Sequence, residues 1–209
     1  MMDEAKAVLQ KYLPAQAVDE VVHLLFSYSD LQLKITAPRR TKLGDYKRIN
    51  RRHHRISINN NLNPYQFLIT LLHELAHYQA YKKYGHRIKP HGKEWKQTFG
   101  RLLQTFLKPD IFPENLLADL QQYAKNPKAS TAGDGKLYLK LSNYDTKDQK
   151  TLKYIFELHP GDYFTLPNGA TYQLQEKRRT RYKCKRLSNQ KIYLIHQNAE
   201  VTPISIKDL

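Results

Sequence analysis

Two histidines and a glutamate with the spacing of a metal site occur in the run His73-Glu74-Leu75-Ala76-His77. Residues four apart on a helix point the same way, so the two imidazoles can reach one metal ion. Glu74 lies on an adjoining part of the helix surface, where it can contact the attacking water without binding the metal. The pattern predicts zinc-assisted hydrolysis with Glu74 as the general base.

The sequence around this run predicts the helix that the chemistry needs. Asn63 is a good N-cap, Pro64 suits the first helical position, and Gly85 is a natural stop. Leucines and a phenylalanine recur at helical spacing and define one apolar stripe, made of Phe67, Leu68, Leu71, Leu72 and Leu75. His73 and His77 fall on nearly the opposite side of the helix from this stripe.

A catalytic zinc needs three protein ligands and an open fourth position, and His91 is the predicted third ligand. It follows Pro90, which starts a new element, and a second amphipathic helix is predicted to begin at or near His91. Two competitors are weaker. His86 is nearer but follows the stop at Gly85, and Glu94, one turn inside the helix, would need a different approach of the two helices.

The order of these segments resembles a SprT-like (Spartan-type) metallopeptidase domain over about the first 125 residues. The segments that carry the resemblance are Thr41-Lys42-Leu43-Gly44-Asp45-Tyr46, Arg55-Ile56-Ser57-Ile58-Asn59, the His73–His77 helix and His91-Gly92-Lys93-Glu94-Trp95. The resemblance implies a compact zinc peptidase core, with zinc on His73, His77 and His91 and with Glu74 as the catalytic glutamate. Characterised eukaryotic members cleave proteins that are covalently trapped on DNA.

The C-terminal part departs from the family pattern. Many relatives carry a zinc ribbon with two cysteine pairs, but Cys184 is the only cysteine, the expected partner position is Leu187, and His196 has no second ligand beside it. One thiolate and scattered histidines do not make a closed structural site. We therefore expect one Zn²⁺ per chain and a zinc-less, ribbon-like C-terminal module held by its own apolar core.

The expected fold class is α+β, with a helical zincin-type metallopeptidase core, a small β-sheet and then a small antiparallel β domain. Several elements are expected, namely helix over residues 3–28 broken at Leu13-Pro14, strands at Leu31–Ile35, Thr41–Tyr46 and Arg55–Asn59, and helix over 113–123. A Pro-, Gly- and Ser-containing stretch over residues 125–135 predicts a boundary near residue 130, giving domains 1–129 and 130–209. Short apolar runs after it, beginning with Tyr138-Leu139 and Leu141, suggest an antiparallel sheet or open barrel. The resemblance also implies a sheet edge along the active-site cleft, to which a peptide could add.

The chain is strongly basic, with 35 Lys and Arg against 19 Asp and Glu, a net charge of +16 and a pI near 9.8. Such an excess favours a polyanionic partner, nucleic acid first and an anionic membrane surface second, although a solvated basic surface gives the same composition. Two basic concentrations supply the candidate nucleic-acid contacts, which are Arg39, Arg40, Lys47, Arg48, Arg51, Arg52, Arg178, Arg179, Arg181, Lys183 and Lys185. His53 and His54 are rejected as a metal pair, because adjacent residues in a strand point to opposite faces.

The sequence shows no secretion signal and no run of about twenty apolar residues, so we expect a cytoplasmic protein, nucleoid association included, with no membrane partner. No oligomeric state is predicted. Three hypotheses stay open: a zinc endopeptidase acting on DNA-associated or DNA-crosslinked proteins, a nucleic-acid-binding module with a mainly structural zinc, and a cytoplasmic zinc peptidase unrelated to DNA. Tyr78 and Tyr84 are candidates for stabilising the oxyanion.

Overall fold

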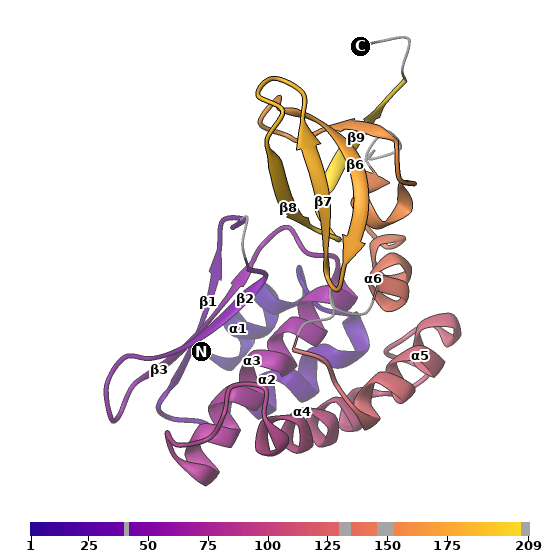
Figure 1. The fold of residues 1–209 in the computed structure, drawn as a ribbon. Helices are drawn as coiled ribbons and strands as arrows, with labels where there is room; N and C mark the ends of the chain where they lie inside the picture. Colours follow the sequence, from indigo (N-terminus) through magenta and orange to yellow (C-terminus); the bar gives the residue numbers. More distant parts are fainter. Residues whose placement is uncertain (40–41, 130–134, 146–152, 206–209) are drawn as a thin grey trace. The chain divides into compact units, whose positions relative to one another are not determined.

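The chain divides into two compact units, residues 1–146 and residues 147–209. The structure, a computed structural model, describes four stretches of the chain, residues 1–39, 42–129, 135–145 and 153–205. These stretches hold six α-helices, a three-stranded sheet and a separate six-stranded antiparallel sheet (Figure 1). The predicted α+β fold class is therefore confirmed.

In its described residues, the first unit combines six α-helices with a small three-stranded sheet. Its helices are α1 (Met2–Leu9), α2 (Val18–Phe26), α3 (Pro64–Tyr84), α4 (Lys93–Phe106), α5 (Glu114–Lys125) and α6 (Gly135–Ser142). Its strands are β1 (Leu31–Thr36), β2 (Gly44–Arg48) and β3 (His54–Asn59). The break predicted at Leu13-Pro14 lies between α1 and α2, and the predicted strands are present, with the second strand beginning and ending two or three residues later than expected.

The small sheet has the order β1-β3-β2, with β1 parallel and β2 antiparallel to β3. The central strand β3 is buried along nearly its whole length, whereas β2 is an edge strand. The register pairs Tyr46 with Ile56 and Gly44 with Ile58. The main-chain oxygen of Leu43 accepts from the N–H of Asn59, so alternate residues of β2, including Gly44 and Tyr46, direct their main-chain groups toward the free edge.

Helix α3 lies between the sheet and α4, and it begins and ends where the sequence predicts (Figure 1). The Asn63 side chain accepts a hydrogen bond from the main-chain N–H of Gln66, and Gly85 ends the helix with a φ of +79°. Because neighbours cover both sides of the helix, its buried residues are not confined to one stripe. The side that carries His73 and His77 faces α4 rather than solvent, since Trp95 and Phe99 pack against the ring of His73.

Helix α6 corrects two expectations about the segment after residue 130. The run that includes Tyr138, Leu139 and Leu141 was predicted as strand, but it is helical, because Leu137 and Leu141, four residues apart, are both buried in the core of the first unit. The unit boundary consequently lies near residue 146, later in the chain than the predicted 129/130 division. Residues 130–134 of the predicted linker are outside the described residues.

The second unit is an antiparallel sheet with its own apolar core. Its strands follow the order β4-β9-β5-β6-β7-β8, and their bounds are β4 (Lys153–Tyr154), β5 (Tyr163–Thr165), β6 (Thr171–Arg178), β7 (Arg181–Arg186), β8 (Ile192–His196) and β9 (Glu200–Ile204). Phe164, Leu174, Cys184 and Val201 are almost fully buried in this core. Cys184 therefore acts as a small apolar core residue, and burial raises the pKa of its thiol to about 12.

Candidate metal centre

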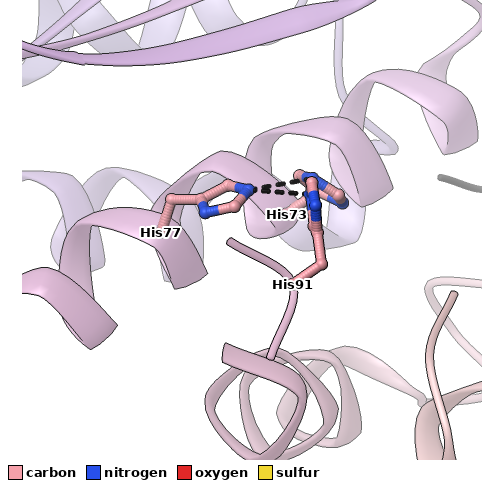
Figure 2. Close-up of side chains that lie close together, drawn as sticks. All are labelled: His73, His77 and His91. Atoms are coloured by element: carbon pink, nitrogen blue, oxygen red, sulfur yellow. Dashed lines mark hydrogen bonds between the residues drawn. The ribbon is translucent and has the colours of Figure 1, made fainter. Parts of the chain in front are cut away.

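Three histidine side chains converge between α3 and the start of α4. The Nε2 atoms of His73 and His77 are 3.3 Å apart, and the Nε2 atom of His91 lies 3.1 Å from the first and 3.0 Å from the second (Figure 2). Nitrogens bound tetrahedrally to zinc at about 2.0–2.1 Å lie about 3.3 Å from one another. The three imidazoles therefore fit a zinc ion, and among the described residues they are the group able to hold a metal.

Burial keeps these imidazoles neutral, as a metal ligand must be. Burial lowers the pKa of His73 to about 2, with the neighbouring charges of His77 and His91 acting in the same direction. Burial also lowers the pKa of His77 to about 4, and that of His91 below its ordinary value. Each ring can then present the lone pair of Nε2 to an ion without first losing a proton.

His91 reaches the site from the connection before α4 rather than from the helix itself. Helix α4 begins at Lys93, with Gly92 as its N-cap. The helix was predicted to begin at or near His91, but His91 lies just before its first turn. His91 adopts a left-handed backbone conformation, with a φ of +57°. A Cβ atom on Gly92 would lie 2.9 Å from the main-chain oxygen of Lys89, so a larger residue would not fit there. Neither His86 nor Glu94, the competing ligands considered above, is part of the three-histidine group.

Trp95 forms a wall behind the histidines, a role that its helical spacing alone does not reveal. Its ring centroid lies 4.6 Å from that of His73, 5.2 Å from that of His77 and 4.7 Å from that of His91. The indole is fully buried, and its Nε1 atom has no hydrogen-bond partner among the described residues. The sequence signal that could have identified this wall is an aromatic residue only four positions after the third ligand.

The carboxyl group of Glu74 is held against β2 and not against α4. A Cβ atom on Gly44 would lie 2.8 Å from Oε1 of Glu74, so this glycine gives the side chain its room. Burial, with a smaller contribution from the charge of Asp45, raises the pKa of Glu74 to about 8. The main-chain N–H of Tyr46 donates to the carboxylate and, with Arg39 and Lys42, lowers the pKa. A buried carboxyl with a pKa near neutrality suits general acid–base chemistry.

Behind Glu74, Tyr46 connects the site to a polar cluster that the sequence did not predict. The Tyr46 hydroxyl lies 2.8 Å from Nδ1 of buried His54, and its ring lies parallel to that of His77 at 6.5 Å. Nε2 of His54 lies 3.7 Å from a carboxylate oxygen of Asp30. Tyr78 donates its hydroxyl to the other oxygen of Asp30, so this candidate oxyanion donor is already engaged. Burial lowers the pKa of His54, against the opposing charge of Asp30.

The predicted nucleic-acid contacts do not all present free cations. Arg39 donates from Nε to Asn59 at 2.9 Å and from Nη1 to the hydroxyl of Ser57 at 2.8 Å, so it braces the sheet. Arg48 donates to the hydroxyl of Tyr81 at 2.7 Å. Several others are exposed or half-buried and form no ion pair with described residues, namely Lys47, Arg51, Arg52, Arg179, Arg181 and Lys185. Arg40 lies outside the described residues.

Two further predicted contacts, Arg178 and Lys183, pair with the exposed carboxylate of Glu176. Burial alternates along β7, since Tyr182 and Cys184 are buried while Arg181, Lys183 and Lys185 are more exposed. The other candidate oxyanion donor, Tyr84, is exposed near the end of α3 with the ammonium of Lys83 over its ring.

Comparison with models of protein families gives a match for the part of the chain that holds the three histidines. The model of the SprT-like family matches residues 14–113, a range that includes all three histidines and Glu74. Over residues 14–113, slightly less than half of the chain, the protein is therefore similar to the SprT-like family. Comparison with curated proteins and with solved structures gave no match to the chain. The SprT-like family is metallopeptidase-like, which implies a metal ion at a site such as the three histidines form. The described part of the chain contains no helix that is long and apolar enough to cross a membrane.

Proposed function

We propose that the SprT-like domain is a zinc-dependent endopeptidase. The observation that carries the proposal is the convergence of three neutral imidazole nitrogens, 3.0–3.3 Å apart, beside a buried carboxyl group on the same helix. His73, His77 and His91 would hold the ion and leave one position open. When bound, zinc supplies a Lewis acid for the scissile carbonyl and lowers the pKa of a water molecule toward 7.

Glu74 is the group that moves the proton. Its carboxylate takes a proton from the attacking water and delivers it to the leaving amine. In the metal-free protein burial raises the pKa of Glu74 to about 8, so the surroundings of this carboxyl group favour the protonated form that it adopts after taking the proton. The free edge of β2 lies beside this carboxyl group and offers main-chain hydrogen bonds to an extended peptide, a mode that gives affinity with little sequence preference.

We further propose that the substrates are proteins associated with, or crosslinked to, DNA. Support comes from the net charge of +16 and from the exposed side chains of Lys47, Arg51 and Arg52 on the first unit, which form no ion pair with the described residues. Cations so arranged attract the phosphate backbone, with an affinity that falls steeply as salt rises.

The test is cleavage of a protein crosslinked to an oligonucleotide, by the wild type, by Glu74→Gln and by the control Glu114→Gln, each with and without chelator. Glu114 is exposed and distant in sequence from the metal centre, so Glu114→Gln should cleave like the wild type. Glu74→Gln should lose cleavage while it keeps zinc and DNA binding. Absence of any chelator-sensitive product would favour a nucleic-acid-binding module with a structural zinc.

A salt series separates the DNA part of the proposal from the peptidase part. Oligonucleotide affinity should fall as salt rises. Arg51→Ala/Arg52→Ala should bind the oligonucleotide more weakly, and with a shallower salt dependence, than the control Lys11→Ala/Lys34→Ala, because it makes fewer phosphate contacts. Cleavage of peptides combined with salt-independent or absent oligonucleotide binding would favour a peptidase unrelated to DNA.

A further inference from the structure

A hollow of about 620 Å³ opens beside the metal centre and runs along the exposed side of α4 to the end of α5. We call it the α4 groove. His91 lies at one end, and the lining continues through Lys93, Lys96 and Arg101 on α4 and Lys125 on α5. The groove is therefore continuous with the position that a scissile peptide bond must occupy if the proposed function is correct.

The shape of the groove follows from a close contact between two helices. A Cβ atom on Gly100 would lie only 2.5 Å from the main-chain oxygen of Ala124, so α4 and α5 touch there through their backbones. Long side chains on either side of the contact then stand above it as walls. Those of α4 recur at three- and four-residue spacing, which places them along one side of the helix.

The charge of the groove is uniformly positive. Four basic residues line it and no carboxylate does. Lys93, Arg101 and Lys125 are exposed and form no ion pair with described residues, and Lys96 donates to the neutral side-chain oxygen of Asn126 at 2.8 Å. The cations are thus available to a negatively charged ligand, with Gln97 and Gln104 among them as neutral hydrogen-bonding groups.

We propose that the α4 groove is a specificity subsite that binds acidic side chains of the polypeptide substrate next to the scissile bond. The proposal rests on the peptidase function proposed above. A nucleic-acid strand fits less well for two reasons. The groove contains no tyrosine, phenylalanine or tryptophan on which bases could stack. A strand lying in the groove would also block the approach of a peptide to His91.

The test uses two fluorescein-labelled peptides, identical except that one carries glutamates and the other lysines around a central alanine pair. Binding is measured by fluorescence anisotropy on zinc-loaded Glu74→Gln protein, so that neither peptide is consumed. Lys93→Glu/Arg101→Glu reverses two charges of the groove. Lys11→Glu/Lys34→Glu makes the same change in net charge at exposed positions outside it. Zinc content is measured for every variant.

The Glu74→Gln background should bind the acidic peptide more tightly than the basic one. The groove reversal should weaken binding of the acidic peptide about tenfold or more and strengthen binding of the basic one, since two attractions become repulsions. The matched reversal should leave the preference unchanged. No preference in the background protein, or equal effects of the two reversals, would overturn the proposal.

A single-stranded oligonucleotide serves as a third probe. If the groove reversal weakens oligonucleotide binding but leaves the peptide preference intact, the groove is a nucleic-acid contact and the proposal is wrong. The two proposals fail separately. If the active protein cleaves both peptides equally well, the proposal for the α4 groove is wrong and the proposed peptidase function stands. Absence of cleavage with an intact, groove-dependent acidic preference overturns the peptidase function and supports the groove as a binding site.

Discussion

Removal of the metal should make the SprT-like domain sensitive to mild acid. Burial lowers the pKa of His73 to about 2 and that of His77 to about 4, whereas an unfolded chain restores both toward 6.5. At pH values between the folded-state and unfolded-state pKa values, the unfolded state binds more protons than the folded state. The stability that the neutral imidazoles contribute is therefore fully present above pH 6.5 and is lost as pH falls below it.

The size of the loss follows from the same two groups. At pH 5 an unfolded histidine is mostly protonated, while His73 and His77 remain mostly neutral in the folded protein. Protonation then favours the unfolded state by about 2 kcal/mol for each histidine, or about 4 kcal/mol for both. Domains of ordinary stability have about 5–15 kcal/mol in total, so the change should be easy to detect.

The assay is urea unfolding of chelator-treated protein at pH 8 and at pH 5, followed by fluorescence. Trp95 is the only tryptophan in the chain and packs against the three imidazole rings, so its emission reports on this part of the molecule. The control is His73→Gln/His77→Gln, which keeps polar side chains but removes both titrating rings. Other shifted groups, such as His54, remain in both proteins and cancel in the comparison.

The free energy of unfolding of the wild type should fall by about 4 kcal/mol more than that of the control between the two pH values. Equal losses in the two proteins would refute the argument, because they would show that these imidazoles are not held neutral by burial. Added zinc should stabilise the wild type at pH 8, and this gain should shrink at pH 5, where protons compete with the ion for the ligands.

Three further substitutions test separate parts of the site. His91→Ala should weaken zinc binding about 100-fold or more, because each ligand contributes about 3 kcal/mol to the binding free energy. Zinc binding is followed by the fluorescence of Trp95, and an affinity equal to that of the wild type would exclude His91 as a ligand. Gly44→Ala should lower peptide turnover about tenfold or more and leave zinc affinity unchanged, because the Cβ atom of the alanine would displace the Oε1 atom of Glu74. Turnover equal to that of the wild type would contradict this prediction. Asn63→Ala should lower the free energy of unfolding in urea by about 2 kcal/mol, because Asn63 caps α3 and also donates a hydrogen bond to α6. An unchanged unfolding midpoint would disprove the role of these hydrogen bonds.

The sequence predicted those parts of the fold whose signals are local. Asn63, Pro64 and Gly85 mark the two ends of α3 by their own backbone preferences, whatever packs on the helix. The spacing of His73 and His77 then follows from helix geometry alone. The convergence of His91 on this pair was a weaker prediction, because it depends on a left-handed residue outside any helix, and neighbouring residues offered competing ligands.

The errors concern elements whose structure depends on distant partners. Leu137 and Leu141 are helical because they pack into the core of the first unit, and Asn63, 78 residues before Leu141 in the chain, donates to its main-chain oxygen. No local pattern in the short apolar run indicates that partner. The surroundings of Arg39 likewise depend on residues distant in the chain, since Asn59 and Ser57 hold its guanidinium against the sheet.

The architecture separates the groups that would bind the ion from the group that would move the proton. The imidazoles face α4, where Trp95 packs against them, whereas the carboxyl of Glu74 lies against β2, where Gly44 makes room and Tyr46 donates a main-chain hydrogen bond. Changes on the two sides of α3 should therefore have different consequences. Substitutions around α4 should alter metal affinity and, through the α4 groove, the choice of substrate. Substitutions in β2 should alter the position and pKa of the base while the metal remains bound.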